Sequence, residues 1–178
     1  MRPENINTVC HRWILEVLPE NAVCVDATMG NGNDTLFLAE HAKKVYAFDI
    51  QSDALKNSQQ KCKDYHNIEY FLKSHAEMDE VISEEVDLVV FNLGYLPKGD
   101  ESITSKAESS MLAIKKALQL CNTHGSVLIA FYIGHPEGLK EYQTFMNAQN
   151  EFKAEVVRTY TYIDRKDAPI LVHLKRNS

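Results

Sequence analysis

The sequence predicts an α/β domain with a Rossmann-like, mostly parallel sheet of seven strands, helices on both faces and an antiparallel C-terminal hairpin. Short apolar runs rich in β-branched residues alternate with longer runs of helical periodicity, which is typical of a doubly wound sheet. The last two apolar runs have no helix between them, so they must pair antiparallel or nearly so. The expected strands cover residues 23–26, 44–50, 68–72, 86–92, 125–132, 152–160 and 169–175.

Length and composition fit one domain spanning residues 1–178. The net charge of −6 argues against broad wrapping of nucleic acid, which relies on many Lys and Arg contacts to phosphate, although a local basic face is still allowed. No apolar run approaches the roughly 20 residues of a membrane span, and residues 1–5 are not followed by the apolar core of a signal peptide. We therefore expect a cytoplasmic protein that does not bind membranes.

The cysteines show no pattern that would bind a metal. Cys10, Cys24, Cys62 and Cys121 include no C-x-x-C pair and no Cys/His metal spacing. We expect buried thiols in a reducing compartment and no metal site.

The first helix is expected from the apolar residues that recur at helical spacing between Ile6 and Leu18. His11 and Arg12 lie off this stripe, and either could line a site, although a solvent-exposed position is the default for both. The stripe includes Trp13, and we expect it to cover the sheet, while a homodimer that uses it is left open.

A glycine-containing turn follows the first strand, which ends at Asp26. Gly30 and Gly32 allow positive φ and close approach of a ligand to the backbone, and Asn33 is an N-cap residue type at the expected start of a helix. A strand, a glycine turn and a helix N-terminus together hold nucleotide-like ligands in doubly wound folds. A structural turn with incidental glycines is the alternative.

The turn is not a complete dinucleotide fingerprint, because Thr35 stands where G-x-G-x-x-G needs its third glycine. The acidic Asp26 before the glycines instead favours S-adenosylmethionine, whose cationic groups need carboxylates and dipoles rather than a pyrophosphate cradle. Asp49 ends the second strand about 20 residues beyond the turn, where a carboxylate can bind both ribose hydroxyls. It could also cap the helix expected over 52–62. In the ribose role, Ile50 and Gln51 would lie over the adenine.

Polar residues also follow the third and fifth strands. Ser74 and His75 come after the third strand and are candidates to contact adenine, although a loop histidine is as often an ordinary surface residue. His135 lies in the turn after the fifth strand and could contact substrate, act as a base or simply shape the turn. Helices are expected within 102–120 and over 137–147.

The fourth strand leads directly into a loop that begins at Asn92 and resembles the (D/N)-P-P-Y loop of amino-group methyltransferases. The side-chain carbonyl of Asn92 and the backbone carbonyl of Leu93 can accept the N–H groups of an amine and aim its lone pair. Tyr95 can stack on a base or close over it. A β-turn in which Gly94 supplies positive φ is the alternative.

The C-terminal hairpin combines cations with aromatic residues, namely Arg158, Arg165 and Lys166 with Tyr160 and Tyr162. This mixture could bind single-stranded RNA through phosphate contacts and base stacking. An ordinary solvent-exposed hairpin tip is the alternative.

Four motifs together resemble one family. They are D-A-T-x-G-N-G-x-D-T-L-F-L-A at 26–39, F-D-I-Q at 48–51, F-N-L-G-Y-L-P at 91–97 and G-H-P-x-G at 134–138. The chain resembles the small bacterial methyltransferases that were first filed as rRNA methylases and are now described as tRNA 5-aminomethyl-2-thiouridine methyltransferases. The resemblance implies a class I fold, S-adenosylmethionine as cofactor, and the primary amine of the wobble uridine in the tRNA anticodon as methyl acceptor.

Residue patterns and resemblance together give two sets of candidate residues. The candidate cofactor-binding residues are Asp26, Thr28, Gly30, Asn31, Gly32, Asn33, Asp34, Thr35, Asp49, Ile50, Gln51, Ser74, His75 and Asn92. The candidate catalytic residues are Asn92, Tyr95, Asp100 and His135. The substrate ammonium must lose a proton, which Asp100, His135 or solvent could accept.

Three other functions are left open. The same loop chemistry would suit methylation of a base amino group in rRNA or DNA. A nicotinamide-dependent oxidoreductase is disfavoured by Thr35 and by the final hairpin. A catalytically silent RNA-binding module is disfavoured by the acidic charge and by the intact 92–97 loop.

Overall fold

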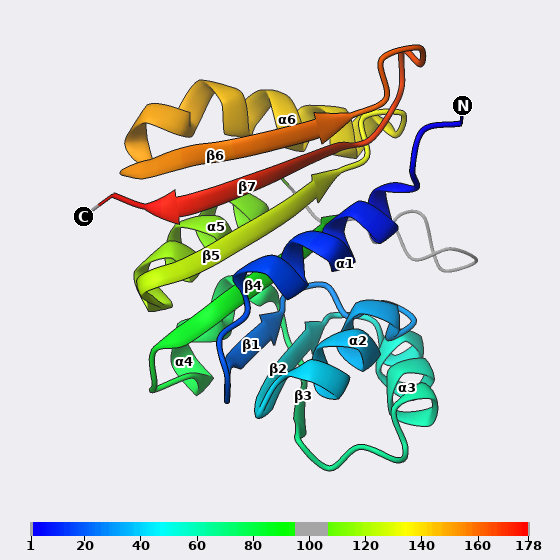
Figure 1. Ribbon diagram of the computed structural model, residues 1–178, viewed down its shortest axis with the longest axis vertical. Coiled ribbons are helices and arrows are strands. Elements are labelled where there is room, and N and C mark those ends of the chain that lie inside the picture. Colours follow the sequence, from blue (N-terminus) through cyan, green and yellow to red (C-terminus); the bar gives the residue numbers. More distant parts are fainter. Residues whose placement is uncertain (1, 95–106, 178) are drawn as a thin grey trace.

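The computed structural model describes residues 2–94 and 107–177, and it contains a single sheet of seven strands in the order β3-β2-β1-β4-β5-β7-β6 (Figure 1). Only β7 runs against its neighbours β5 and β6, while the remaining pairings are parallel. This confirms the predicted topology. The strands are β1 Val23–Asp26, β2 Lys44–Asp49, β3 Ile68–Leu72, β4 Val86–Leu93, β5 Cys121–Phe131, β6 Ala154–Thr161 and β7 Ile170–Arg176.

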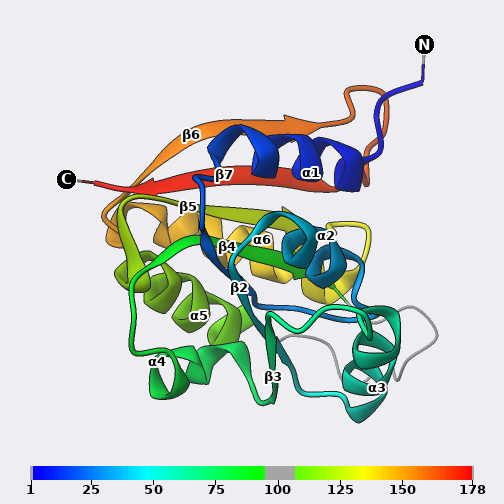
Figure 2. The same cartoon turned by 60° about the horizontal axis from the view of Figure 1, so that its bottom comes forward.

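Helices cover both faces of the sheet (Figures 1 and 2). On one face lie α1 and α2, with α3 beside α2, and on the other lie α4, α5 and α6. The helices are α1 Ile6–Val17, α2 Asn33–His41, α3 Ser52–Lys61, α4 Met78–Val81, α5 Ala107–Leu120 and α6 Pro136–Ala148, with 3-10 turns at His75–Glu77 and Gln149–Glu151. Within the described residues, none of these helices combines the length and apolar character needed to cross a bilayer.

The first helix packs against the sheet as the apolar spacing predicts. Asn5 caps it by accepting a hydrogen bond from the Asn7 N–H. Val9 and Trp13 are buried in a core shared with β5 and β7. Because burial of one large apolar side chain contributes roughly 2 kcal/mol, this face is enough to hold α1 in place.

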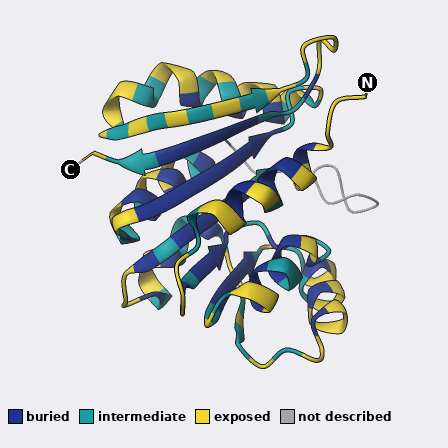
Figure 3. Cartoon of the chain, viewed as in Figure 1, coloured by how far each residue is buried: buried dark blue, intermediate teal, exposed yellow. Residues whose placement is uncertain are grey.

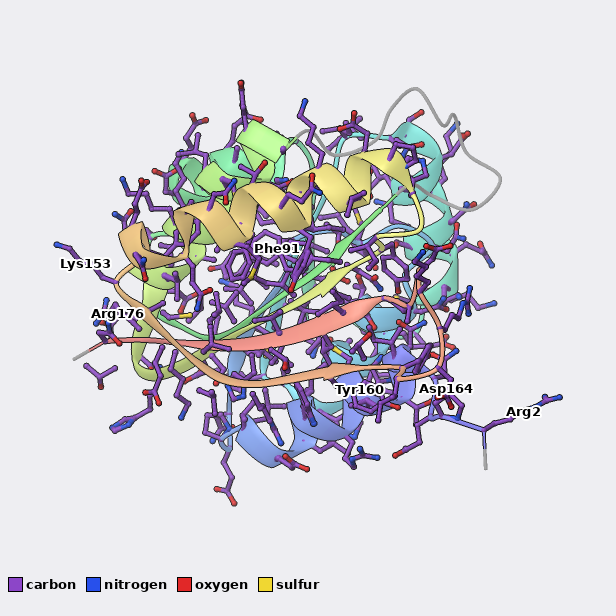
Figure 4. The ribbon with its side chains drawn as sticks, turned by 90° about the horizontal axis from the view of Figure 1, so that it is seen from above. Arg2, Phe91, Lys153, Tyr160, Asp164 and Arg176 are labelled. Atoms are coloured by element: carbon purple, nitrogen blue, oxygen red, sulfur yellow. The ribbon has the colours of Figure 1, made fainter. Side chains whose placement is uncertain are left out.

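The central strands β4 and β5 are buried almost throughout, because helices cover them on both faces (Figure 3). Phe91 lies inside the molecule between the sheet and α6 (Figure 4). The edge strand β6 instead alternates between exposed and half-buried residues. The continuous apolar runs in the sequence therefore mark the middle of the sheet.

Some boundaries differ from the sequence prediction. Strand β5 begins at Cys121 rather than 125, because Cys121 pairs with Val86 before the register shifts. The single-turn helix α4 was not expected, since four residues are too few to show helical periodicity. All four cysteines are buried and reduced, as expected.

Candidate active site

The turn between β1 and α2 requires glycine at position 32. Gly32 has a φ of 87°, and a Cβ added there would lie 2.8 Å from the Ser58 side-chain oxygen and 2.9 Å from the Ser58 Cα. Gly30 also has positive φ, at 49°. The turn is thus pressed against α3, and the N-terminus of α2, where backbone N–H groups lack helical partners, lies at the carboxyl edge of the sheet.

Asp26, which lies on the buried side of this turn, holds it through hydrogen bonds. Its fully buried carboxylate accepts hydrogen bonds from the Thr35 hydroxyl at 2.7 Å and from the Thr28 N–H at 3.1 Å. Burial and the nearby charge of Asp34 raise the pKa of Asp26 to about 7, against the effect of both hydrogen bonds. Asp26 therefore fixes the shape of the turn from within the protein.

Asp49 lies at the end of β2, beside the turn. One carboxylate oxygen accepts from the Gly30 N–H at 3.0 Å and the other from the Gln51 N–H at 2.9 Å. Because a carboxylate has about four acceptor positions, both oxygens can still accept from a diol. Burial raises the pKa of Asp49, while its backbone hydrogen bonds oppose this shift. The next residue, Ile50, is 51% exposed and offers an apolar surface beside this carboxylate.

Ser74 and His75 are not ordinary surface loop residues, because both form hydrogen bonds within the fold. Ser74 caps a short 3-10 turn, where its hydroxyl accepts from the Ala76 N–H. His75 is buried, and its Nδ1 lies 3.1 Å from the Ala27 carbonyl oxygen. Burial lowers the pKa of His75 to about 4, so the imidazole is neutral. Since a carbonyl only accepts, Nδ1 carries the proton and Nε2 is left as an acceptor.

Asn92 lies at the end of β4, between the turn and α1. Its backbone N–H donates to the Thr28 hydroxyl at 2.7 Å, and its side-chain Nδ2 donates to Asp34 Oδ2 at 3.3 Å. Because the Asp34 carboxylate only accepts, the amide of Asn92 must face it with its NH₂ group. The side-chain carbonyl of Asn92 does not face Asp34. The Tyr132 side chain also hydrogen-bonds the Asn92 side chain, and a carbonyl with two lone pairs can still accept from another molecule.

The second oxygen of Asp34 forms a hydrogen bond with His11, a residue for which the sequence predicts a solvent-exposed position by default. His11 Nε2 lies 2.7 Å from Asp34 Oδ1, and the His11 ring stacks on Phe37 with centroids 3.9 Å apart. The only sequence signal for this contact was the position of His11 off the apolar stripe. Arg12, by contrast, pairs with Glu4 on the surface.

A cavity of about 460 Å³ opens between α1 and α2. It is lined by Asn7, Thr8, His11, Asn33, Asp34, Leu36, Phe37, Glu40 and Asn92. The cavity therefore brings hydrogen-bond acceptors and donors, such as Asp34 and Asn92, together with the aromatic side chain of Phe37, and it reaches the end of β4. No group of three His, Cys, Asp or Glu side chains within residues 2–94 and 107–177 is arranged to hold a metal ion.

The other candidate residues are placed as follows. His135 is half-buried at the N-cap of α6. Asn31 accepts from the Asn57 side chain, and Asn33 contacts the Lys61 ammonium, so both are held by α3. Tyr95 and Asp100 lie outside the described residues.

The hairpin residues are used largely within the fold. Arg158 pairs with Glu16 at 2.6 Å and lies over the Trp13 ring. The Tyr160 hydroxyl donates to the Glu4 carbonyl, and the Tyr162 hydroxyl accepts from the Ile6 N–H. Tyr160 therefore lies against the N-terminal segment, while Arg2 extends away from it (Figure 4). For Arg158, Tyr160 and Tyr162, these contacts differ from both expectations, because the three side chains pack on α1 and the N-terminal segment and do not form an ordinary solvent-exposed tip.

Known proteins resemble this chain over most of its length. The family described as "Putative rRNA methylase" matches residues 45–175. A chloroplastic tRNA (mnm(5)s(2)U34)-methyltransferase of Arabidopsis thaliana is 30% identical over 184 aligned residues, covering 93% of this chain and 67% of the plant protein.

Two solved structures share the fold closely. A putative rRNA-methylase from Clostridium thermocellum has a TM-score of 0.91 and 33% identity, covering 98% of this chain and 99% of that one. A putative methyltransferase from Streptococcus mutans, in complex with SAH, has a TM-score of 0.87 and 32% identity, covering 97% and 98%.

Proposed function

The chain belongs to the family described as putative rRNA methylases, and from this premise we propose that it methylates the primary amine of 5-aminomethyl-2-thiouridine at the wobble position of tRNA. It is a methyltransferase that uses S-adenosylmethionine, and its fold is that of the class I enzymes. The name of the plant relative supports the tRNA substrate, because it specifies a wobble uridine with an aminomethyl-derived group.

The residues at the carboxyl edge of the sheet fit this cofactor. The turn at Gly32 leaves no room for a side chain, and the Asp49 carboxylate keeps acceptor positions for the ribose hydroxyls. We assign the ribose to Asp49 and the adenine to Ile50, Gln51, Ser74 and His75. When bound, S-adenosylmethionine supplies an electrophilic methyl group, which the lone pair of the acceptor amine takes in line.

Asn92 carries the proposal for the acceptor side. Its side-chain NH₂ donates to Asp34 and its backbone N–H donates to the Thr28 hydroxyl, and its side-chain carbonyl oxygen, which has two lone pairs, can accept an amine N–H. An amine held by this oxygen and by the Leu93 carbonyl has its lone pair aimed rather than free to rotate. Such positioning is the main contribution that a protein makes to a direct displacement.

In vitro methylation of undermodified tRNA, followed by mass spectrometry of its nucleosides, tests the proposal. We expect one added methyl group on the aminomethyl nitrogen. The Asn92→Ala variant should be slower by about 10²-fold, because the amine is no longer positioned, while its affinity for SAH in calorimetry stays nearly unchanged. Asn147→Ala, on the exposed face of α6, is the control and should keep full activity. Methylation of a base amino group in rRNA instead of tRNA would overturn the assignment.

A further inference from the structure

The inference concerns the proton that the acceptor must lose, and it rests on the proposed function. An alkylamine such as that of Lys has a pKa of about 10.4, so the acceptor is an ammonium at neutral pH. An ammonium has no lone pair to attack a methyl group. Some group beside Asn92 must therefore take a proton before transfer, and the described residues include one candidate that the sequence did not single out as a base.

His11, Asp34 and Asn92 form a continuous hydrogen-bonded chain. Asp34 receives the Asn92 amide on one oxygen, at 3.3 Å, and His11 Nε2 on the other, at 2.7 Å. Because a carboxylate only accepts, the neutral imidazole carries its proton on Nε2 and its lone pair on Nδ1. Asp34 thus sets both the orientation of the amide and the tautomer of the imidazole.

The imidazole is accessible from the same space as the amide. His11 and Asn92 both line the cavity between α1 and α2, and the His11 side chain keeps 27% of its surface exposed. Among residues 2–94 and 107–177, no hydrogen bond to His11 Nδ1 is formed. The ring is also fixed in angle, because it lies within 9° of parallel to Phe37. A molecule that reaches Asn92 through this cavity therefore passes the His11 side chain.

We propose that His11, oriented by Asp34, accepts the proton that the acceptor ammonium loses before methyl transfer. One N–H bond of the ammonium breaks, its electron pair stays on the amine nitrogen, and the proton moves to Nδ1 of His11. Methyl transfer then turns the amine into a secondary ammonium and the sulfonium into a thioether, so one proton is released overall. His11 passes this proton to water through its exposed edge.

Other titratable and charged groups lie around His11. They are Asp34, Glu40 and His41 on α2, Cys10 and Arg12 on α1, and Tyr132 at the end of β5. Burial and the charge of Asp34 raise the pKa of Tyr132, and burial raises that of Cys10. These two groups therefore stay neutral over the range in which an imidazole and an alkylamine titrate.

The test compares wild type with His11→Gln in single-turnover methylation of undermodified tRNA between pH 6.5 and 9.5. Glutamine can still donate to Asp34, but it cannot accept a proton. We expect the variant to be slower by about 10²-fold or more at pH 7. The difference should shrink by about tenfold per pH unit as free amine becomes available. Arg12→Gln, one residue away on α1, should match wild type at every pH.

A loss that is the same at every pH would indicate a structural role and overturn the proposal, as would full activity of His11→Gln at pH 7. NMR of the imidazole gives a readout independent of activity. Wild type should show the proton on Nε2, and a proton on Nδ1 would contradict the assigned lone pair. If wild type does not methylate the aminomethyl group but methylates another RNA, the proposed function is wrong. The role of His11 as proton acceptor is then wrong as well, because it rests on that function.

Discussion

Substitution of Gly32 by alanine tests the geometry of the cofactor turn most directly. The φ of 87° is in the left-handed region, which costs a residue with a Cβ about 1–2 kcal/mol. The new methyl group would also lie 2.9 Å from the Ser58 Cα, a backbone atom that a rotamer change cannot move. Overpacking of this kind typically costs about 1–3 kcal/mol. The two terms predict that Gly32→Ala lowers the free energy of unfolding by roughly 2–5 kcal/mol.

Urea unfolding followed by circular dichroism measures this loss, and calorimetry with SAH measures its effect on the site. We expect weaker SAH binding, because α3 and the turn must move apart to admit the methyl group. Gly134→Ala is the matched control, since Gly134 lacks a positive φ and its added Cβ would lie 3.3 Å from Asp167, a tight contact that needs a shift of only a few tenths of an ångström, so we expect a smaller loss there. A loss below about 0.5 kcal/mol in Gly32→Ala, the usual range for a surface substitution, would refute the reasoning.

Two further predictions concern Asp49 and His75. Asp49→Ala should weaken SAH binding by about 10- to 100-fold, because hydrogen bonds to a charged group contribute about 1.5–3 kcal/mol; an unchanged dissociation constant in calorimetry would remove Asp49 from the ribose site. His75 has a pKa of about 4 in the fold and about 6.5 when unfolded, so the unfolded chain binds the extra proton and stability falls as pH drops from 6.5 to 4. Urea unfolding at pH 7 and pH 5 gives the loss of unfolding free energy between these two pH values. We expect this loss to be smaller in His75→Gln than in wild type. An equal loss in the two proteins would contradict the argument from burial.

The sequence predicted the sheet because its central strands are buried on both faces. Runs such as Val86–Leu93 are apolar almost throughout, and only a strand covered by two helix layers needs that composition. The antiparallel pairing of β6 and β7 could be predicted because the sequence has no helix between these two strands. The one-turn helix α4 could not be predicted, since four residues carry no periodic signal.

The two parts of the site differed in how far they could be predicted. Asp49 and Asn92 each lie at or near the end of a strand, and parallel strands bring their carboxyl ends to one edge. The contact between His11 and Asp34 joins residues 23 positions apart on two helices, and it depends on how α1 lies against α2. From the sequence, Arg158 is expected among the surface cations of the hairpin, but strand alternation puts it on the half-buried side of β6 with Val156.

The contacts between the N-terminal segment and the final hairpin connect one wall of the cavity, α1, to the opposite end of the sequence. The Ile6 N–H bonds the Tyr162 hydroxyl across 156 positions, and α1 also packs on β5 and β7. These are contacts of high sequence separation, which add to the long-range contacts that slow folding. The position of His11 beside Asp34 therefore depends on the C-terminal hairpin as well as on α2, because both hold α1 in place.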